Sequence, residues 1–220
     1  MSHVEPSPAP VPTTGHIVTA LIETIWQGLA GATPLEQSAT ILGLLGVWLA
    51  TRQSLWNFPV GLVQVVLAGI VFSQQRLFAD ACLQAVYFIA LAWGWWCWTH
   101  PANDRRASLP VTTLSTRHRI WFVVAGLMAC LAWGLLLDRV GDPMPWRDAF
   151  IAAFGVISQW LEAHKKIEAW LGWVMVNLAG IGVYAAIGLY WFVGLYLIYL
   201  VLSFIGLVSW RRSMQHEDTT

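Results

Sequence analysis

Charged residues are scarce in this chain of 220 residues. Asp, Glu, Lys and Arg make up 11% of it, whereas soluble domains carry roughly 25%, so the chain has too few charges to cover an ordinary water-facing surface. Twelve basic and twelve acidic residues give a formal net charge of zero, with no dense basic patch, and nucleic acid is therefore excluded as an expected partner. The hydrophobic share of 57%, together with 15 Trp, predicts an all-α polytopic membrane protein that resides in a lipid bilayer.

The sequence also lacks the common motifs of catalysis, metal binding and ATP hydrolysis. Its three cysteines, Cys82, Cys97 and Cys130, lie inside apolar segments without a CxxC or His/Cys cluster, so we expect them to form neither disulfides nor a zinc site. A P-loop is missing, which argues against an ATP-driven pump, and HExxH and GxSxG motifs are missing, which argues against intramembrane hydrolysis. We expect no enzymatic activity and no cofactor.

The first 30 residues differ from the rest of the chain. Residues 1–16 are rich in Pro and contain no Lys, Arg or apolar core, so we expect a disordered tail and no secretory signal. Residues 17–30 form a short amphipathic run that contains Glu23 and Gln27. A run of this length cannot cross a hydrocarbon core of ~30 Å, which predicts an interfacial helix along the membrane surface.

Seven apolar segments follow, each bounded by charge, Pro or Gly, and we predict that all seven are transmembrane helices. They cover about residues 35–51, 56–74, 78–98, 120–137, 146–162, 169–187 and 190–210. The first and the fifth are interrupted or ended by Gln37, Gln159 and Glu162.

Basic residues between the segments are distributed unevenly. Nine lie on one side of the membrane if the loops are counted from an outside N-terminus: Arg52, Arg105, Arg106, Arg117, Arg119, Lys165, Lys166, Arg211 and Arg212. Arg76, Arg139 and Arg147 lie on the other side. Because basic loops tend to remain in the cytoplasm, this asymmetry predicts an outside N-terminus and a cytoplasmic tail at residues 211–220.

The second half of the sequence repeats the first at a distance of 112 residues. This shift aligns several identical residues: Gly43 with Gly155, Trp48 with Trp160, Tyr87 with Tyr199, Gly94 with Gly206, and Trp98 with Trp210. The pattern predicts two copies of a three-helix unit, residues 35–98 and 146–210, joined by one linker transmembrane helix at 120–137. A single linker helix keeps both copies in the same orientation, which is the 3+1+3 parallel repeat of the SWEET transporters. Such repeats indicate transport.

Each predicted unit places a stripe of polar and aromatic residues on two of its helices. The four stripes are Asn57, Gly61 and Gln64; Asp80, Gln84 and Tyr87; Trp170, Trp173 and Asn177; and Phe192, Tyr196 and Tyr199. Polar residues at membrane depth are costly and are therefore candidates for function. Four stripes around a shared axis predict a central ligand cavity, and because none of them carries Lys or Arg, a phosphorylated ligand is not expected.

Some of these residues have a competing structural interpretation. Trp near helix ends is typical of interfacial anchors, which applies to Trp56, Trp95, Trp96, Trp98, Trp146 and Trp210. We interpret Gln64 and Asn177 as residues that contact a ligand. The alternative for both is that their amides form hydrogen bonds between helices. Three carboxylates lie at helix ends, where we expect salt bridges with Lys165, Lys166 or Arg76 rather than ligand or ion binding: Asp80, Glu162 and Glu168.

Three stretches resemble the PnuC family of nicotinamide riboside transporters: "SLWNFPVGLVQVVLAGIVF" at 54–72, "FADACLQAVYF" at 78–88 and "KKIEAWLGWVMVNLAGIGVY" at 165–184. The resemblance extends from Leu35 to Trp210. It implies a SWEET-like fold and the uptake of nicotinamide riboside, an NAD precursor, across the inner membrane of a bacterium. It also implies a homo-oligomer, with a trimer expected, and a cytoplasmic nicotinamide riboside kinase that traps the product. The residues that it places around the substrate are Trp56, Asn57, Gln64, Gln84, Trp170, Trp173 and Asn177.

The chemistry of that ligand agrees with the stripes. A cationic pyridinium stacked on Trp gains about 2 kcal/mol when water is excluded, and Asn and Gln amides pair with a carboxamide and with sugar hydroxyls. We expect facilitated diffusion by alternating access, with the tyrosines Tyr87, Tyr196 and Tyr199 also contacting the substrate. Two alternatives stay open. One is a transporter of another vitamin, such as thiamine or riboflavin, and the other is a non-transporting vitamin receptor subunit that docks through the loop at 103–119.

Overall fold

The computed structural model describes residues 14–101, 109–142, 144–186, 188 and 190–217. Within these residues the regular structure is eight α-helices, with one isolated bridge between Thr112 and Lys166. The helices are α1 Thr14–Gly31, α2 Pro34–Thr51, α3 Asn57–Gln74, α4 Phe78–Thr99, α5 Thr116–Arg139, α6 Pro145–Ala163, α7 Glu168–Ala186 and α8 Tyr190–Glu217.

Each apolar segment identified in the sequence, and the short run at 17–30, corresponds to one helix; Trp56 lies just before α3, and residue 187 lies outside the described residues. Helix α1 begins at Thr14, and the rest of the tail predicted at 1–16 lies outside the described residues. Helix α8 continues through Arg211 and Arg212 to Glu217, so residues 211–217 of the predicted cytoplasmic tail are helical. A helix has no reason to stop where it leaves the bilayer, since its backbone hydrogen bonds are internal.

Five of the described helices are long and apolar enough to cross a membrane by length and composition: α3, α4 from Asp80, α5, α7 and α8. Helices α2 and α6 have 18 and 19 residues but are not in that set. They are the two segments that Gln37, Gln159 and Glu162 interrupt or end. An all-helical chain with several candidate spans is therefore observed, and the count of seven spans stays a prediction.

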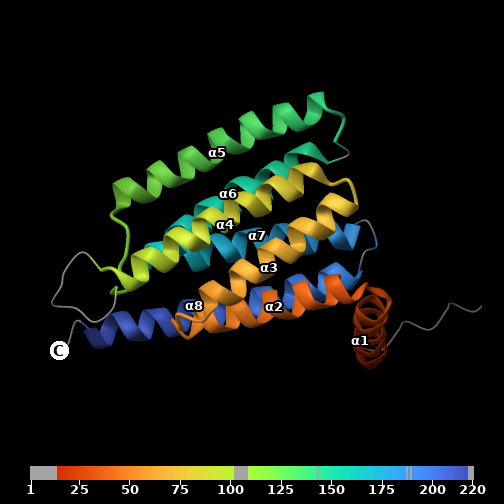
Figure 1. Cartoon of the computed structure of the whole chain (residues 1–220), viewed down its shortest axis with the longest axis horizontal. Helices are drawn as coiled ribbons and strands as arrows, with labels where there is room; N and C mark the ends of the chain where they lie inside the picture. The colour runs from red at the N-terminus through yellow and green to blue at the C-terminus, as the bar shows by residue number, and fades with distance from the viewer. Residues whose placement is uncertain (1–13, 102–108, 143, 187, 189, 218–220) are drawn as a thin grey trace, which may run out of the picture.

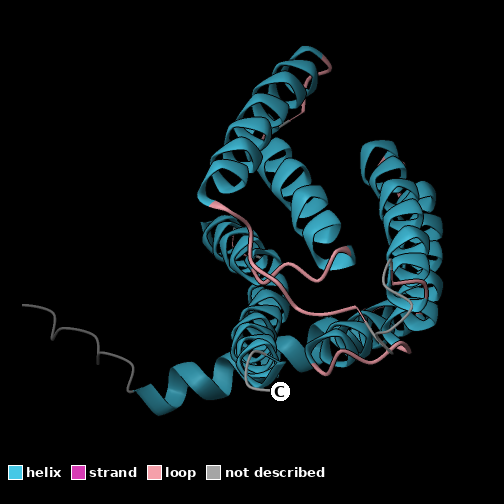
Figure 2. Ribbon diagram, turned by 90° about the vertical axis from the view of Figure 1, so that its left-hand side faces the viewer, coloured by secondary structure: helices cyan, strands magenta, loops and turns pink. Residues whose placement is uncertain are grey.

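Helices α2 to α8 run alongside one another, whereas α1 crosses the end of the bundle (Figure 1). Neighbours in sequence pack together as α2 with α3 and α3 with α4, and again as α6 with α7 and α7 with α8. We call α2–α4 the first group and α6–α8 the second group. The two groups meet where α4 packs on α6 and where α2 packs on α8, while α5 packs on α6 and α1 on α8. Figure 2 shows α1 extending sideways from the other helices, at the lower left.

Two tryptophans join the groups, Trp98 at the end of α4 and Trp210 about two turns before the end of α8. The Trp98 Nε1 atom donates a hydrogen bond to the Ala163 carbonyl at 3.1 Å, and Trp210 Nε1 donates to the Ala50 carbonyl at 3.0 Å. Both indoles are buried, and their ring centroids lie 5.9 Å apart. The prediction that Trp98 and Trp210 are interfacial anchors is therefore wrong. The other four tryptophans of that set are exposed: Trp56, Trp95, Trp96 and Trp146.

The hydrophobic core lies around these two indoles and the turns beside them. Val111, from the segment between α4 and α5, and Ile167, from the turn between α6 and α7, are buried with them. The turns that follow α2 and α6 also match in backbone conformation, because Gln53 has φ of 54° and Lys165 has φ of 48°. Positive φ is uncommon for residues with a side chain, so the first helix of each group ends in the same unusual turn. Arg76, after α3, has a similar φ of 61°.

Candidate functional site

Trp170, the first residue of the stripe on α7, lies in the packed core. Its side chain is 1% exposed, and its ring meets that of Trp210 edge to face with centroids 5.4 Å apart. Gly206 on α8 allows this approach, because a Cβ atom there would lie 2.5 Å from atoms of the Trp170 ring. The Nε1 atom of Trp170 is buried and has no hydrogen-bond partner among the described residues. A buried donor without a partner is costly.

Trp173, one turn further along α7, is half-buried and faces α6. Its Nε1 atom donates a hydrogen bond to Oε2 of Glu162 at 2.8 Å. The opposite edge of the indole approaches Gly155, where its Cζ3 atom lies 4.0 Å from the position of an added Cβ. The hydroxyl of Tyr87, from α4, packs against the same glycine. Trp173 thus lies along α6 between a carboxylate and a phenol.

Asn177 completes the stripe and connects α7 to α8. It is 5% exposed, and its Nδ2 atom donates to the Ser203 hydroxyl at 3.1 Å. That hydroxyl in turn donates to the carbonyl of Tyr199 at 2.8 Å. The amide nitrogen therefore makes the interhelical hydrogen bond that was the alternative to ligand contact.

The tyrosines bring the two groups together at a pair of glycines. The hydroxyl of Tyr199, on α8, packs against Gly43 on α2, where an added Cβ would lie 2.6 Å from the oxygen and 3.6 Å from Cγ of Gln64. The hydroxyl of Tyr87, on α4, packs against Gly155 on α6 in the corresponding way. Each phenol contacts a glycine of the other group, so the first and second groups make equivalent tyrosine–glycine contacts with each other.

Tyr196 lies beside Tyr199 on α8. Its ring covers Gly180 and has centroid distances of 5.3 Å to Tyr184 and 6.5 Å to Tyr199. The structure therefore places five of the ten predicted site residues at or beside the contacts between the two groups: Gln64 and Tyr199 at Gly43, Tyr196 next to Tyr199, and Tyr87 and Trp173 at Gly155.

The remaining residues from the first group lie elsewhere. Asn57 is 3% exposed and donates from Nδ2 to the Ser54 carbonyl at 2.7 Å, at the start of α3. Trp56, beside it, is 70% exposed. Gln84 lines a groove of about 720 Å³ between α3 and α4, together with Gly69 and other mostly apolar residues. Gln64 has no hydrogen bond among the described residues, so its amide is available.

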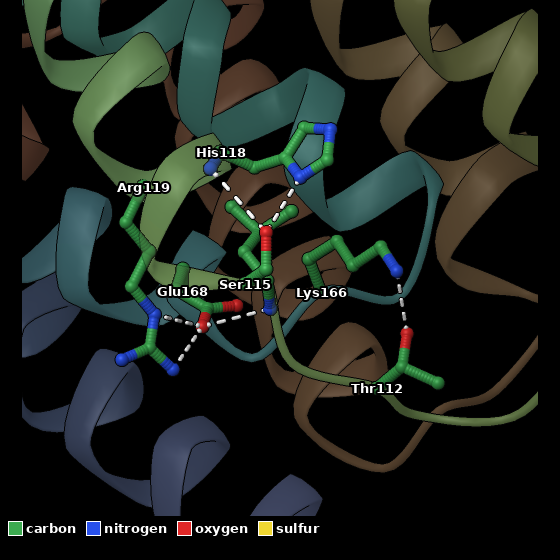
Figure 3. A network of polar contacts seen from close by, with 7 residues as sticks. Thr112, Ser115, His118, Arg119, Lys166 and Glu168 are labelled. Atoms are coloured by element: carbon green, nitrogen blue, oxygen red, sulfur yellow. Dashed lines mark hydrogen bonds and ion pairs between the residues drawn. The ribbon is translucent and has the colours of Figure 1, made fainter.

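The carboxylates do not form the salt bridges expected from the sequence. Glu168 pairs with Arg119, whose Nη2 lies 2.8 Å from its Oε1, and the same oxygen accepts from the Leu114 N–H at 3.0 Å (Figure 3). Lys166 instead donates to the Thr112 hydroxyl at 2.7 Å. These bonds tie the segment before α5 to the start of α7. Of the loop proposed as a docking surface, residues 103–108 lie outside the described part.

Three polar or small residues at the site were missed by sequence reasoning. Ser203, which accepts from Asn177, lies four and seven residues after Tyr199 and Tyr196 and so continues their helical face. Glu162 continues the face of Gly155 in the same way, seven residues later. Ser158 lies on α6 between them and packs against Gly172 on α7. Extending the stripe of Tyr196 and Tyr199 by one turn would have identified Ser203, whereas none of the four stripes lies on α6, the helix that carries Ser158 and Glu162.

Apolar helices around a small set of phenols, amides and one indole define a multi-pass helical membrane transporter rather than an enzyme. The chain belongs to the nicotinamide mononucleotide transporter family, whose family model matches residues 33–212. The chain is 29% identical over 210 residues to the nicotinamide riboside transporter PnuC of Escherichia coli K12, covering 84% of this chain and 88% of that protein. It is 30% identical over 192 residues to the riboflavin/roseoflavin transporter RibM of Streptomyces davaonensis, covering 84% of each.

The fold is also found in a solved structure. The crystal structure of the vitamin B3 transporter PnuC matches with a TM-score of 0.70 and covers 93% of this chain and 94% of that chain, at 20% sequence identity. At this identity the match establishes the fold alone.

Proposed function

We propose that this protein takes up nicotinamide riboside by facilitated diffusion, with alternating access to one central site. The observation that carries the proposal is the cluster of Gln64, Tyr87, Trp173, Tyr196 and Tyr199 at the contacts between the two groups. Aromatic faces suit a flat cationic ring, and amides and phenols suit a carboxamide and ribose hydroxyls. The named substrate of the relative from Escherichia coli supports the same choice.

A nucleoside suits this cluster better than the mononucleotide in the family's name. A phosphate group requires Arg or Lys, or several N–H donors, to offset the loss of water. The five clustered residues include no cation, and the nearest charge on α6 is the carboxylate of Glu162. The other five residues that the resemblance implies also remain proposed substrate contacts: Trp56, Asn57, Gln84, Trp170 and Asn177. For them to reach the same substrate, the helices must be arranged differently in the bound state.

The proposed architecture is seven spans in a 3+1+3 parallel repeat. Its support is the paired geometry of the two groups: Trp98 and Trp210 make equivalent hydrogen bonds, and Tyr87 and Tyr199 make equivalent glycine contacts. In this proposal residues 35–98 and 146–210 rock against each other about the central site, residues 120–137 cross the membrane as the linker, and residues 17–30 lie along its surface.

The proposed setting is the inner membrane of a bacterium, with the N-terminus outside and the C-terminus in the cytoplasm, from the distribution of basic residues. A uniporter only equilibrates its substrate, so net uptake depends on a cytoplasmic kinase that phosphorylates nicotinamide riboside. We also propose that the protein assembles as a homo-oligomer, in the form of a trimer.

Riboflavin is the second candidate substrate, because the relative from Streptomyces davaonensis is named as a riboflavin and roseoflavin transporter. Its isoalloxazine ring is flat but neutral, so it would gain stacking without the cation–π attraction. Thiamine is cationic and is the third vitamin to compare.

Uptake by purified protein in liposomes tests the proposal. Labelled nicotinamide riboside should enter liposomes that contain the protein, down its concentration gradient, faster than it enters liposomes without protein. Unlabelled nicotinamide riboside should compete with this uptake better than riboflavin or thiamine. Competition dominated by riboflavin would reassign the substrate. Binding without entry would favour the receptor subunit instead.

A further inference from the structure

The carboxylate beside Trp173 has no positively charged partner. The hydrogen bond from Trp173 Nε1 is the one contact of the Glu162 side chain with another polar group, and neither ion pair of the described residues includes it. A half-buried carboxylate without a cation is costly, and at membrane depth such a residue is a candidate for function.

The basic residues that follow Glu162 in the chain are directed elsewhere. Their contacts are His164 Nδ1 with the Trp160 carbonyl at 2.8 Å, Lys165 Nζ with Gln53 Oε1 at 3.2 Å, and Lys166 Nζ with Thr112 Oγ1 at 2.7 Å. None of these contacts involves Glu162, so a cationic ring against Trp173 would be the group that favours the charged form of this carboxylate.

The position of the indole brings that charge to the proposed site. Glu162 and Gly155 are seven residues apart, which places both on the same face of α6. Trp173 extends between them, with Nε1 at Glu162 and the opposite edge beside Gly155 and the hydroxyl of Tyr87. A ring stacked on Trp173 would lie a few ångströms from the carboxylate.

We propose that Glu162 determines specificity for a positively charged aromatic ring. The proposal rests on the proposed function, in which Trp173 stacks against the substrate. The hydrogen bond holds the indole in place, and the charge adds a Coulomb attraction to the cation–π attraction of the ring face. A neutral ring of the same shape gains the stacking but not the attraction. The substrate class selected is a flat cationic heterocycle on a sugar, with flavins disfavoured.

The test compares two nucleosides that differ in charge and not in shape. Nicotinamide riboside carries a pyridinium, and 3-(ribofuranosyl)benzamide replaces the ring nitrogen with carbon and is neutral. Dissociation constants for both are measured on purified wild type, Glu162→Gln and Glu162→Asp. Gln keeps an oxygen that can accept from Trp173 but removes the charge, while Asp keeps the charge on a shorter side chain. The melting temperature of each variant controls for folding.

Wild type should prefer nicotinamide riboside by about tenfold or more, the range for a desolvated cation–π contact with an added charge. Glu162→Gln should reduce this preference by roughly threefold or more, mainly by weakening nicotinamide riboside, and should leave the part that the Trp173 ring face supplies. Glu162→Asp should retain most of it. An unchanged preference in Glu162→Gln, or equal loss of both ligands, would overturn the proposal and leave Glu162 a purely structural role. If wild type binds neither nucleoside, the proposed function itself fails and the inference with it.

Discussion

Lys165 donates a hydrogen bond from Nζ to Oε1 of Gln53 at 3.2 Å, and these two residues are 112 positions apart in the sequence. Each occupies the turn after the first helix of its group, and both have positive φ. Residues that meet their own equivalents lie close to a twofold axis, so this contact agrees with the proposed pseudo-twofold relation between the groups. Lys165 is 4% exposed, and its Nζ also lies 4.4 Å from the centroid of the Trp98 ring.

The two tryptophan contacts should contribute equally to stability. Trp98→Phe and Trp210→Phe each remove an indole N–H and leave a buried carbonyl, of Ala163 or Ala50, without that donor. We expect each variant to lose about 1–3 kcal/mol of unfolding free energy, measured by thermal denaturation in detergent. Trp146→Phe, at an exposed position, is the matched control and should change little. A large loss in only one variant would argue against equivalent roles.

Trp173 should carry a large part of substrate affinity. Trp173→Ala is expected to weaken binding of nicotinamide riboside by at least about 1 kcal/mol, the lower range for a stacked cation, with near-normal expression in the membrane. Calorimetric titration of purified protein measures the change. Trp133→Ala, on the exposed face of α5, controls for the loss of a tryptophan. Unaltered affinity in a well-folded Trp173→Ala protein would remove this residue from the site.

Phosphorylation of the ligand should reduce its affinity strongly. Nicotinamide mononucleotide would bring a phosphate among phenols and amides and near the carboxylate of Glu162, where no cation offsets the loss of hydration. Competition of both compounds against labelled nicotinamide riboside measures the difference. Comparable inhibition by the two would refute the proposed lining.

The contact between Tyr87 and Gly155 should tolerate no added methyl group. Gly155→Ala would place a Cβ against the Tyr87 hydroxyl at the junction of α4 and α6, and overpacking of this kind costs about 1–3 kcal/mol. We expect slower uptake and a lower melting temperature. Gly182→Ala is the matched control, because nothing lies within 4 Å of its added Cβ.

A second change distinguishes this steric effect from a general loss of helix packing. Tyr87→Phe removes the oxygen that the new Cβ would meet, so the double variant Gly155→Ala with Tyr87→Phe should recover the stability that Gly155→Ala loses. Failure of the second change to restore any stability would show that the phenol is not the obstacle.

Transport should depend on membrane potential and on no ion gradient. Asp80 and Glu168 lie near helix ends, and Glu162, the carboxylate beside the proposed site, is proposed to attract the cationic substrate rather than a coupled proton or sodium ion. Initial uptake into substrate-free liposomes should persist without either gradient. One charge crossing 100 mV is worth about 2.3 kcal/mol, so an inside-negative potential should bias a cationic nucleoside up to roughly fifty-fold. Concentrative uptake at zero potential that requires a pH or sodium gradient would exclude a uniporter.

Much of the helical framework is predictable from the sequence alone. Seven apolar segments bounded by charge, Pro or Gly correspond to α2–α8, because segment length and composition depend only on local residues. The family is predictable as well, from the motifs around Trp56 and Asn57 and around Trp170 and Asn177, and residues 33–212 match its model. The end of α8 lies beyond the predicted segment, because Arg211 and Arg212 end the apolar run without ending the helix.

The sequence alone determines which helical face a side chain occupies, and the tertiary structure alone decides what that face meets. Trp56 and Trp98 both lie near helix ends, yet the first is 70% exposed and the second is 4% exposed, because α6 of the other group lies across Trp98 and supplies the Ala163 carbonyl. Asn177 lies on the predicted stripe, but its amide meets Ser203, 26 residues later. Helical periodicity is a local property, whereas the partner opposite each residue depends on how α4, α6, α7 and α8 pack, which no short stretch of sequence encodes.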